Sequence, residues 1–594
     1  MRSETFERRD SIMHKAGVAV VTGALLISMT PLPALAEGSS SSSGSSTATS
    51  QPTGEPPSGG GSAPGDAGGS MPGGGAGGAG GANTMTYDYT GTLSGTLTAD
   101  GDSQEASDQT ITATDVDVNA ALAENGGALA LSGVTLEKSG DDTNGDNCNF
   151  YGVNSILLAT GDDSTAKVSN SKLNATSEGS NAIFATDGAT VYANGDTITT
   201  SAGNSRGLDA TYDGTIIANE MGISTQGDHS ASIATDRGGG NISVTNSTLS
   251  TAGSGSPLLY STGDIEVSGV TGTATGSQIA GMEGLNTVLI NNSTLSSTIT
   301  EKTASDPIAN AVIIYQSTSG DAESTTGEAA TFQAVGSKLS SAIQSGSFFY
   351  VTNTTANILL QGTTLDYDSS AANLIQVEGN DSNNWGTAGS NGGTATLTLA
   401  GENVTGNVSV DTISSLALYL TGNSTWTGAA SITENANGST SDSPITVNVD
   451  DGSTWVVTAD STVSALNVAS GGSVVDESGK TVTIVANGQT VVQGDSSLTV
   501  TVTGSYSTTY DGSGASTVSP DRIDRSAFDA EYGTSTTFAM GDSTSVSASD
   551  VAQASTAPSS SAEATASTND ATSASTGNVF LDIWNAIVDF FTGR

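Results

Sequence analysis

The chain has 594 residues, 75 of them glycine, and its 15 Lys and Arg residues against 61 Asp and Glu residues give a formal net charge of −46. A nucleic-acid partner is not expected, because so few cations cannot build the basic face that neutralises phosphates. The single cysteine, Cys148, excludes a disulfide scaffold. Only one histidine, His229, lies beyond the first thirty residues, which argues against histidine-based metal sites and catalytic relays.

Residues 1–36 have the three-part layout of a secretory signal peptide. Four basic residues precede an apolar run over residues 16–29, and Ala34 and Ala36 are the small residues before an expected cleavage after Ala36. An uncleaved membrane anchor is the other reading, but the run is shorter than the roughly 20 apolar residues of a typical span. We therefore expect a secreted, extracellular protein, either free or associated with the cell surface.

The rest of the chain divides by composition. Residues 37–83 are rich in Gly, Ser and Pro and predict a flexible, disordered linker, because they hold no apolar surface to bury. Residues 84–505 alternate short Val, Ile, Leu and Thr runs with Asn, Asp and Gly. Residues 506–577 return to Ser, Thr and Ala low complexity and predict a second disordered tether. Residues 578–594 are apolar again.

One eight-residue phrase recurs through residues 84–505. It has apolar residues at its first and third positions, Asn or Gly at its fifth and usually Leu, Ile or Val at its last, as in residues 166–173 (AKVSNSKL) and 242–249 (ISVTNSTL). The phrase starts at residues 166, 191, 216, 242, 265 and 288, so one unit takes 23 to 26 residues. The 44-residue interval from 288 to 332 reads as about two units, and intervals of 37 and 39 residues elsewhere indicate loop insertions.

Each unit contains three short extended segments separated by turns. Asp187-Gly188 and Asn194-Gly195 fit such turns, because Asn and Gly tolerate positive φ. One unit cannot bury its own apolar residues, whereas stacked units bury a continuous core. Leucine-rich repeats need more leucine, helical repeats need a 3.6-residue period, and sandwiches have longer units. The sequence therefore predicts an all-β fold, a parallel β-helix solenoid, with Leu173, Ile198, Ile223 and Leu249 stacked in its core.

These phrases resemble the bacterial secreted right-handed parallel β-helix proteins of the pectin-lyase-like superfamily, as do residues 232–240 and 256–264. Residues 418–426 and 447–455 are similar to the late coils of adhesin-type β-helices and autotransporter passengers. The resemblance covers residues 84–505 and implies a right-handed coil. It also implies what an enzyme of the superfamily would use: clustered acids for Ca²⁺ with a Lys or Arg base in lyases, and grouped aspartates in hydrolases.

A cluster of charged residues on adjacent units is the best candidate for a ligand-binding patch. Arg206 and Asp209 lie one unit before the segment that starts at Asp228, so stacking would bring the two segments together. The cluster is either an exposed ladder of charges, which adds little stability, or a sugar-binding or catalytic site. Its members are Arg206, Asp209, Asp228, His229, Asp236 and Arg237.

No catalytic residue, cofactor site or resident metal site is assigned from the sequence. The acidic run over residues 141–146 has the ligands of a weak extracellular Ca²⁺ site, and it also reads as a polar insertion loop.

Residues 578–594 predict a short amphipathic helix, which is too short and too acidic to span a membrane. We expect it to dock on the open end of its own β-helix or on a partner or the cell envelope, or else to be a disordered tail. The apolar residues at the spacing of one helical face are Phe580, Ile583, Trp584, Ile587, Val588 and Phe591.

The function expected from these observations is that of an extracellular, non-enzymatic β-helix protein. Long solenoid faces rich in Thr, Asn and Ser present many hydrogen-bonding groups, which suits adhesin-like binding of glycans or other surface molecules, surface proteins included. The alternative from the same resemblance is a polysaccharide lyase or a glycoside hydrolase.

Overall fold

The structure is a computed structural model that describes residues 86–317, 322, 329–381, 385–438, 441, 443–520 and 522–540. All of these residues belong to one compact unit, Ala63–Arg594. The predicted signal peptide (1–36), the linker (37–83) and the C-terminal amphipathic helix (578–594) lie outside the described residues.

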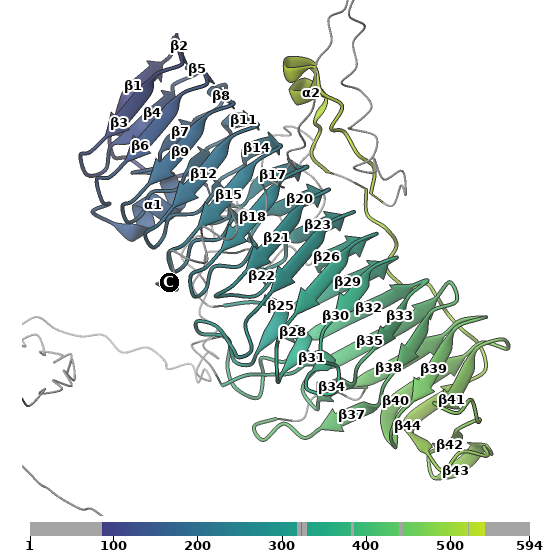
Figure 1. Cartoon of the computed structure of the whole chain (residues 1–594). Coiled ribbons are helices and arrows are strands. Elements are labelled where there is room, and N and C mark those ends of the chain that lie inside the picture. The colour runs from purple at the N-terminus through teal and green to yellow at the C-terminus, as the bar shows by residue number, and fades with distance from the viewer. Residues whose placement is uncertain are drawn as a thin grey trace, which may run out of the picture. The chain divides into compact units, whose positions relative to one another are not determined.

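The described chain is an all-β parallel solenoid in which short strands stack coil upon coil (Figure 1). Most coils contribute one strand to each of three long sheets, as the three extended segments per unit predict. All strand pairs are parallel except β42 with β43. We name the sheets A, B, C and D.

Sheet A has 13 strands: β1 (Gly95–Asp100), β4 (Asn119–Glu124), β7 (Leu157–Thr160), β10 (Ile183–Thr186), β13 (Leu208–Ala210), β16 (Ile233–Thr235), β19 (Leu259–Ser261), β22 (Ala280–Glu283), β25 (Asn310–Tyr315), β28 (Ser347–Thr352), β31 (Asn373–Val377), β34 (Val408–Asp411) and β37 (Ala430–Thr433).

Sheet B contains β2 (Ser103–Ser107), β5 (Ala128–Ser132), β8 (Thr165–Ser169), β11 (Thr190–Asn194), β14 (Gly214–Asn219), β17 (Gly240–Thr245), β20 (Asp264–Ser268), β23 (Thr287–Asn291), β26 (Ala330–Val335), β29 (Thr355–Gln361), β32 (Thr394–Ala400), β35 (Ser415–Thr421), β38 (Ile445–Val449), β40 (Ser461–Val468), β44 (Thr499–Ser507), β42 (Thr483–Ala486) and β43 (Gln489–Val492).

Sheet C contains β3 (Thr110–Ala113), β6 (Thr135–Lys138), β9 (Lys172–Ala175), β12 (Thr197–Thr200), β15 (Gly222–Thr225), β18 (Thr248–Thr251), β21 (Thr271–Ala274), β24 (Thr294–Ser297), β27 (Lys338–Ser341) and β30 (Thr364–Asp366). Sheet D contains β33 (Asn403–Thr405), β36 (Thr425–Thr427), β39 (Thr454–Val457) and β41 (Ser473–Asp476).

The strand register follows the eight-residue phrase. The first residues of successive phrases pair in sheet B, as Ala166 with Val191 and Val191 with Ile216. The last residues pair in sheet C, and no more than 2% of each is exposed. This confirms the predicted core ladder, which consists of Leu173, Ile198, Ile223 and Leu249.

The fifth residue of each phrase makes the turn from sheet B to sheet C. Asn170 and Asn246 have φ values of 49° and 51°, and Gly195 and Gly269 have 72° and 66°. This left-handed region strains most residues with a Cβ but suits Asn and Gly, so the phrase requires one of them at this position. Glu220 is the exception, with a φ of 53°.

The 44-residue interval does not hold two units. Val288 of β23 pairs directly with Phe332 of β26, so the interval is a single coil enlarged by insertions. One insertion, residues 298–309, lies between β24 and β25, and the expectation of two units is corrected accordingly.

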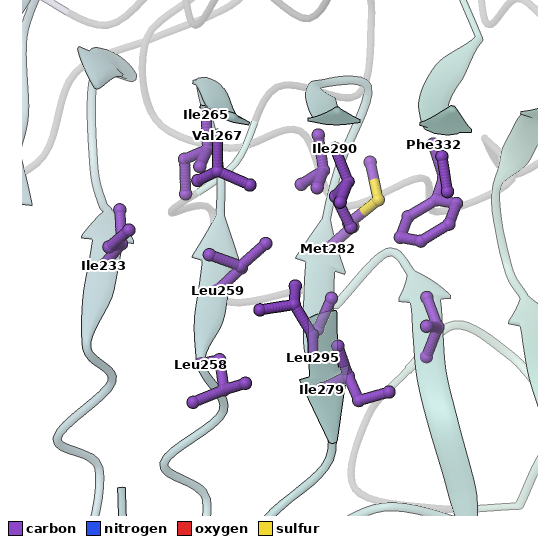
Figure 2. Close-up of a cluster of buried hydrophobic side chains, with 14 of the residues drawn as sticks. Ile233, Leu258, Leu259, Ile265, Val267, Ile279, Met282, Ile290, Leu295 and Phe332 are labelled. Atoms are coloured by element: carbon purple, nitrogen blue, oxygen red, sulfur yellow. The ribbon is translucent and has the colours of Figure 1, made fainter. Parts of the chain in front are cut away.

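The core lies between the sheets and is filled by Leu, Ile, Val, Ala and Phe side chains. Burying each Leu or Ile contributes roughly 1.5–3 kcal/mol relative to leaving it exposed. Figure 2 shows side chains from neighbouring coils pointing into this interior, among them Ile233, Leu259, Ile265, Val267, Ile290 and Leu295.

Buried serines satisfy turn N–H groups between coils. The N–H of Ser180 donates to the hydroxyl of Ser205 at 3.0 Å, and the N–H of Ser205 donates to the hydroxyl of Ser230 at 3.0 Å. The N–H of Ser230 in turn donates to the hydroxyl of Ser256 at 2.9 Å. The hydroxyls of Ser205, Ser230 and Ser256 thus each accept a hydrogen bond from a backbone N–H that would otherwise be buried without a partner.

Residues 507–520 and 522–540, which we call the strap, lie against the outer face of sheet B. The N–H of Ser516 donates to Thr398 of β32 at 2.9 Å, and the N–H of Ser519 donates to Gln333 of β26 at 2.7 Å. Farther along, the strap forms helix α2 (Ser526–Tyr532). The strap therefore runs back from late coils towards early ones.

The strap differs from the tether that composition predicts for residues 506–577. Phe528 of α2 is fully buried and packs with Ile523 of the strap against Ile217 of β14. A few apolar residues within a Ser- and Thr-rich segment are enough to hold it, because sheet B offers apolar side chains on its outer face. Neither helix of the described chain, both of seven residues, is long enough to cross a membrane.

Candidate functional site

The outer face of sheet A carries the candidate site. Side chains alternate between the two faces of a strand, and every second residue of these strands points away from the core. One outward column is formed by register partners on six successive coils: Phe184, Asp209, Ala234, Tyr260, Gly281 and Ile313.

An insertion between β6 and β7 covers one end of this column. It forms helix α1 (Gly145–Tyr151), which begins where the side chain of Asn144 accepts hydrogen bonds from two backbone N–H groups. The helix ends at Gly152, which has a φ of 70°. Phe150 of α1 lies under the guanidinium of Arg237, 3.8 Å from ring centroid to Cζ.

Two further insertions cover the other end. Residues 298–309 precede β25, and the loop between β31 and β32 brings Trp385 against Tyr315, with their rings stacked at 4.2 Å between centroids. These insertions and α1 leave the outer face of β19 and β22 between them. The 39-residue interval seen in the sequence is the coil that holds Trp385.

Arg206 joins the predicted patch to α1. Its Nη1 donates to Asp209 Oδ2 at 3.0 Å and to Asn149 Oδ1 at 2.9 Å, and its Nη2 donates to Asp236 Oδ2 at 2.8 Å. All three charged side chains are buried, with 7% of Arg206, none of Asp209 and 5% of Asp236 exposed. The ion pairs are therefore not the exposed ladder that the sequence suggested.

One guanidinium serves two carboxyl groups in this cluster. Burial raises the pKa of Asp209, while the nearby Arg206 guanidinium opposes that rise and Asp236 adds to it. Asp236 also accepts a hydrogen bond at Oδ1 from the backbone N–H of Arg237 at 2.9 Å.

The remaining predicted residues have different surroundings. His229 is exposed, has a φ of 53° and lines the same pocket as Arg206. Asp228 accepts a hydrogen bond from the N–H of Ser254 at 2.8 Å and does not line the pocket. Arg237 lies over Phe150. The fold thus brings Arg206, Asp209 and Asp236 together, and His229 lines the same pocket as Arg206. The backbone N–H of Arg237 donates to Asp236 at 2.9 Å, but neither Arg237 nor Asp228 lines the pocket.

A pocket of ≈ 180 Å³ lies between the insertions, over β19 and β22. Its floor includes Gly281, and the pocket extends into the space that a side chain at this position would fill. Besides Arg206, the residues that give it chemical character are His229, Tyr260, Gln278, Asp306, Tyr315 and Trp385.

Gln278 presents an amide to the pocket. Its side chain is only 5% exposed, and its Oε1 accepts a hydrogen bond from Ser277 at 2.6 Å. Its Nε2 lies 3.5 Å from the point where a Cβ on Gly281 would lie. Across the part of the chain that the structure describes, no acceptor pairs with this Nε2. An unpaired, nearly buried donor favours a ligand that supplies the acceptor.

Glu283 holds the aromatic wall in position. Its Oε2 accepts from the hydroxyls of Tyr260 at 2.8 Å and of Tyr315 at 3.0 Å, and its Oε1 accepts from Ser317. Burial raises the pKa of both tyrosines well above the usual value, so they remain hydrogen-bond donors.

Asp306 is the acid on the pocket wall. Its Oδ2 accepts from Asn310 Nδ2 at 2.8 Å, and 6% of the residue is exposed. Burial raises its pKa to about 7, with Asn310 and Lys302 opposing the rise. No side chain within the described ranges forms an ion pair with Asp306, and Lys302 acts on its carboxyl group without such a contact.

Sequence reasoning missed Tyr260, Gln278, Asp306, Tyr315 and Trp385. Tyr260 lies in residues 256–264, which carry part of the resemblance to β-helix proteins. The 39-residue interval, which predicts an insertion, was the available signal for Trp385, because an insertion bearing a tryptophan on a solenoid face is a candidate wall of a pocket. The 44-residue interval that holds Asp306 reads as two units and therefore gave no such signal.

No metal centre is found in the described residues, where no three His, Cys, Asp or Glu side chains are grouped to hold an ion. In the acidic run, Asp141 accepts from the N–H of Glu178 at 3.0 Å and Asp146 lies in the first turn of α1. Cys148 is buried, which raises the pKa of its thiol and keeps it protonated.

A second, more open hollow of ≈ 560 Å³ is lined by residues of the 298–309 insertion, by Ser345 and Gly346 before β28, and by β31 with the segment that precedes it. Its chemically distinct lining residues are Glu301, Lys302, Ser345, Asn373, Gln376 and Asn407, and it has no aromatic wall.

The described chain is an all-β parallel solenoid with a polar and aromatic pocket on sheet A. Comparisons of the chain with protein-family models, with curated proteins and with solved structures find no match.

Proposed function

We propose that the chain is a secreted, non-enzymatic β-helix protein that binds glycans on surface molecules, as an adhesin does. The observation that carries the proposal is the pocket beside Gly281, which is lined by the amide of Gln278, with no acceptor on its Nε2 in the described residues, and by aromatic side chains. Sugars present both hydroxyl groups and apolar ring faces, and this combination of donors and aromatic rings suits them.

A glycan array probed with the full chain tests the proposal. The full chain is needed because a fragment ending at residue 505 would lack the strap. Gly281→Leu should abolish binding, because the strand accommodates a Cβ here at 3.5 Å or more while the rest of the side chain fills the pocket.

Gly222→Leu is the matched control. Gly222 also lies in a strand, and a Cβ there meets no atom within 4 Å. Retention of glycan binding by Gly281→Leu, or no binding by the unaltered chain, contradicts the proposal.

A polysaccharide lyase or glycoside hydrolase remains the second candidate, favoured by one observation. Asp306, with its raised pKa, has the character of a general acid, and Glu283 supplies a second carboxyl group next to the same aromatic wall. Hydrolysis or elimination of a polysaccharide that is lost in Asp306→Asn, Asp236→Ala or Arg237→Ala would replace the binding proposal. The binding proposal includes no cofactor, whereas a lyase of this superfamily would use Ca²⁺.

Attachment to the cell is a separate proposal, in which residues 578–594 contact the envelope or a partner there. Deleting residues 578–594 and fractionating the cells tests it. Unchanged surface retention would show that this segment is not the anchor.

A further inference from the structure

The charges around the pocket bear on which sugar it accepts. Its walls contain one guanidinium, that of Arg206, and this group is already engaged by Asp209, Asp236 and Asn149. A ligand carboxylate would therefore have to displace a buried ion pair to reach a cation. Such a displacement is costly, because it leaves a buried carboxyl group without its partner.

The cationic side chains near the pocket do not offer a ligand carboxylate another partner. Arg237 stacks on Phe150 of α1 and is not part of the pocket wall. Lys302 is exposed and lines the second hollow. His229 is at the exposed rim.

Asp306 supplies a negative charge to the pocket wall. It is nearly buried, lines the pocket and has only the neutral amide of Asn310 as a side-chain partner in the part of the chain that is described. Burial raises the pKa of its carboxyl group even though Asn310 and Lys302 oppose the rise, and a cation bound beside the carboxylate would be held by a charge-assisted hydrogen bond.

The remaining surfaces of the pocket are those of a sugar site rather than of a simple amine site. The Nε2 of Gln278 needs an acceptor, which a hydroxyl or ring oxygen supplies. Tyr260 and Trp385 offer apolar ring surface. A pocket of ≈ 180 Å³ is small beside the roughly 300–1,000 Å³ of sites for drug-sized ligands, so it accepts a single small residue.

We infer that the pocket binds an amino sugar, a hexosamine with a free ammonium group beside Asp306, in preference to neutral sugars and uronates. This inference rests on the proposed function, because it specifies the ligand of the same pocket.

Isothermal titration of the full chain with D-glucosamine, D-glucose, N-acetyl-D-glucosamine and D-glucuronate at pH 7.5 tests the inference. Glucosamine should bind about tenfold more tightly than glucose or N-acetylglucosamine, because only it carries the ammonium group, and glucuronate should bind most weakly. This ranking on the unaltered chain needs no variant.

Two substitutions assign the preference to Asp306. Asp306→Asn keeps an acceptor for Asn310, and it should remove the preference, so that the ratio of glucosamine to glucose affinity falls from about ten to about one. Glu301→Gln is the matched control, because it removes one exposed negative charge from the same loop outside this pocket, and the preference should persist. If Asp306→Asn does not fold, the ranking of the four sugars on the unaltered chain is sufficient to test the inference.

The outcomes separate the two proposals. Equal affinities for glucosamine and glucose, both lost in Gly281→Leu, would overturn the amino-sugar inference and leave glycan binding standing. No binding of any of the four sugars would overturn the inference, and with a blank glycan array it would overturn the proposed function too. Binding of N-α-acetyl-lysine amide without glucosamine would assign the pocket to lysine side chains and also overturn the inference.

Discussion

Arg525 in the strap donates from Nη1 to both the carbonyl oxygen and the hydroxyl of Ser243, at 2.9 Å each, although 282 residues separate the two in the sequence. Its Nη2 donates to Ala218 O at 2.9 Å and to Thr245 Oγ1 at 3.0 Å. Only 2% of Arg525 is exposed. Burial lowers its pKa to about 10, so the guanidinium stays charged at neutral pH. One side chain thus connects the strap to adjacent strands of sheet B.

Replacing this side chain should weaken the whole fold. Arg525→Met keeps an apolar stem but removes every donor, leaving buried acceptors unpaired, and should lower the free energy of unfolding by about 2–4 kcal/mol. Unfolding in guanidinium chloride measures the change in the free energy of unfolding. Lys167→Met is the control, because the Lys167–Glu531 ion pair is exposed and its loss should cost less than about 0.5 kcal/mol. Equal midpoints for Arg525→Met and the unaltered chain would show that the strap is not docked in solution.

The core ladder gives a second prediction. Leu249 pairs with Ile223 and Gly272 and is 2% exposed, so Leu249→Asp would bury a charge with no partner and cost several kcal/mol. Thr248→Asp changes the neighbouring residue, which is exposed on the outer face of sheet C, and should be nearly neutral. Thermal melts followed by circular dichroism compare the two variants. A Leu249→Asp melt like that of Thr248→Asp would refute the register.

The serine stack between coils can be tested at one position. Ser205→Ala removes the acceptor of the Ser180 N–H, and the unpaired buried donor should cost about 1–3 kcal/mol. Ser250→Ala makes the same chemical change at an exposed residue and should have no measurable effect. Urea unfolding of both variants provides the measurement, and equal stabilities would show that water replaces the lost hydroxyl.

Asp196 makes stability depend on pH. It accepts from the N–H of Ser171 at 2.7 Å, and burial raises its pKa to about 7 in the folded state. In the unfolded chain it ionises near pH 4. Between about pH 4 and 7 the folded state holds the extra proton, so this group's contribution to stability falls as the pH rises through that window.

Asp196→Asn keeps the acceptor for Ser171 and cannot ionise. Relative to the unaltered chain, its stability should therefore rise between pH 4 and 7.5, by an amount on the order of a few kcal/mol. Denaturant titrations at pH 4.5 and 8 measure the change. If both proteins lose stability in parallel over this range, Asp196 is not the group that titrates.

The repeat could be predicted from the sequence because each eight-residue phrase contains both the residue that makes the turn and the residue that enters the core. Asn170 and Asn246 mark the turn, and the Leu173 and Leu249 positions mark the core, so register follows from simple alignment of phrases. The interval after Val288 could not be resolved this way, because an insertion and an additional coil lengthen the sequence equally. Pairing with Phe332 distinguishes them.

The site was predictable only where its residues belong to the repeat. Arg206, Asp209 and Asp236 occupy repeat positions, so stacking predicts that they meet. Their burial depends on α1 and on Phe150, whose placement no periodicity encodes. Trp385 and Asp306 lie in insertions, and which strand an insertion covers depends on tertiary packing rather than on local sequence.

The strap escaped prediction for a related reason. Its segment is mostly Ser, Thr and Asp, and the few residues that hold it, such as Ile523, Arg525 and Phe528, lack the spacing of the repeat. Their partners lie on coils far earlier in the chain. No pattern within the segment itself therefore indicates which residues contact sheet B.

The strap also has a consequence for the time course of synthesis. Arg525 lies 307 residues after Ala218, the carbonyl that it binds. At roughly 5–20 residues per second, translation delivers Arg525 about 15–60 s after Ala218. For that interval Ile217 has neither Phe528 nor Ile523 to cover it. The early coils must therefore remain soluble through their own polar faces or through a chaperone until the strap has been synthesised.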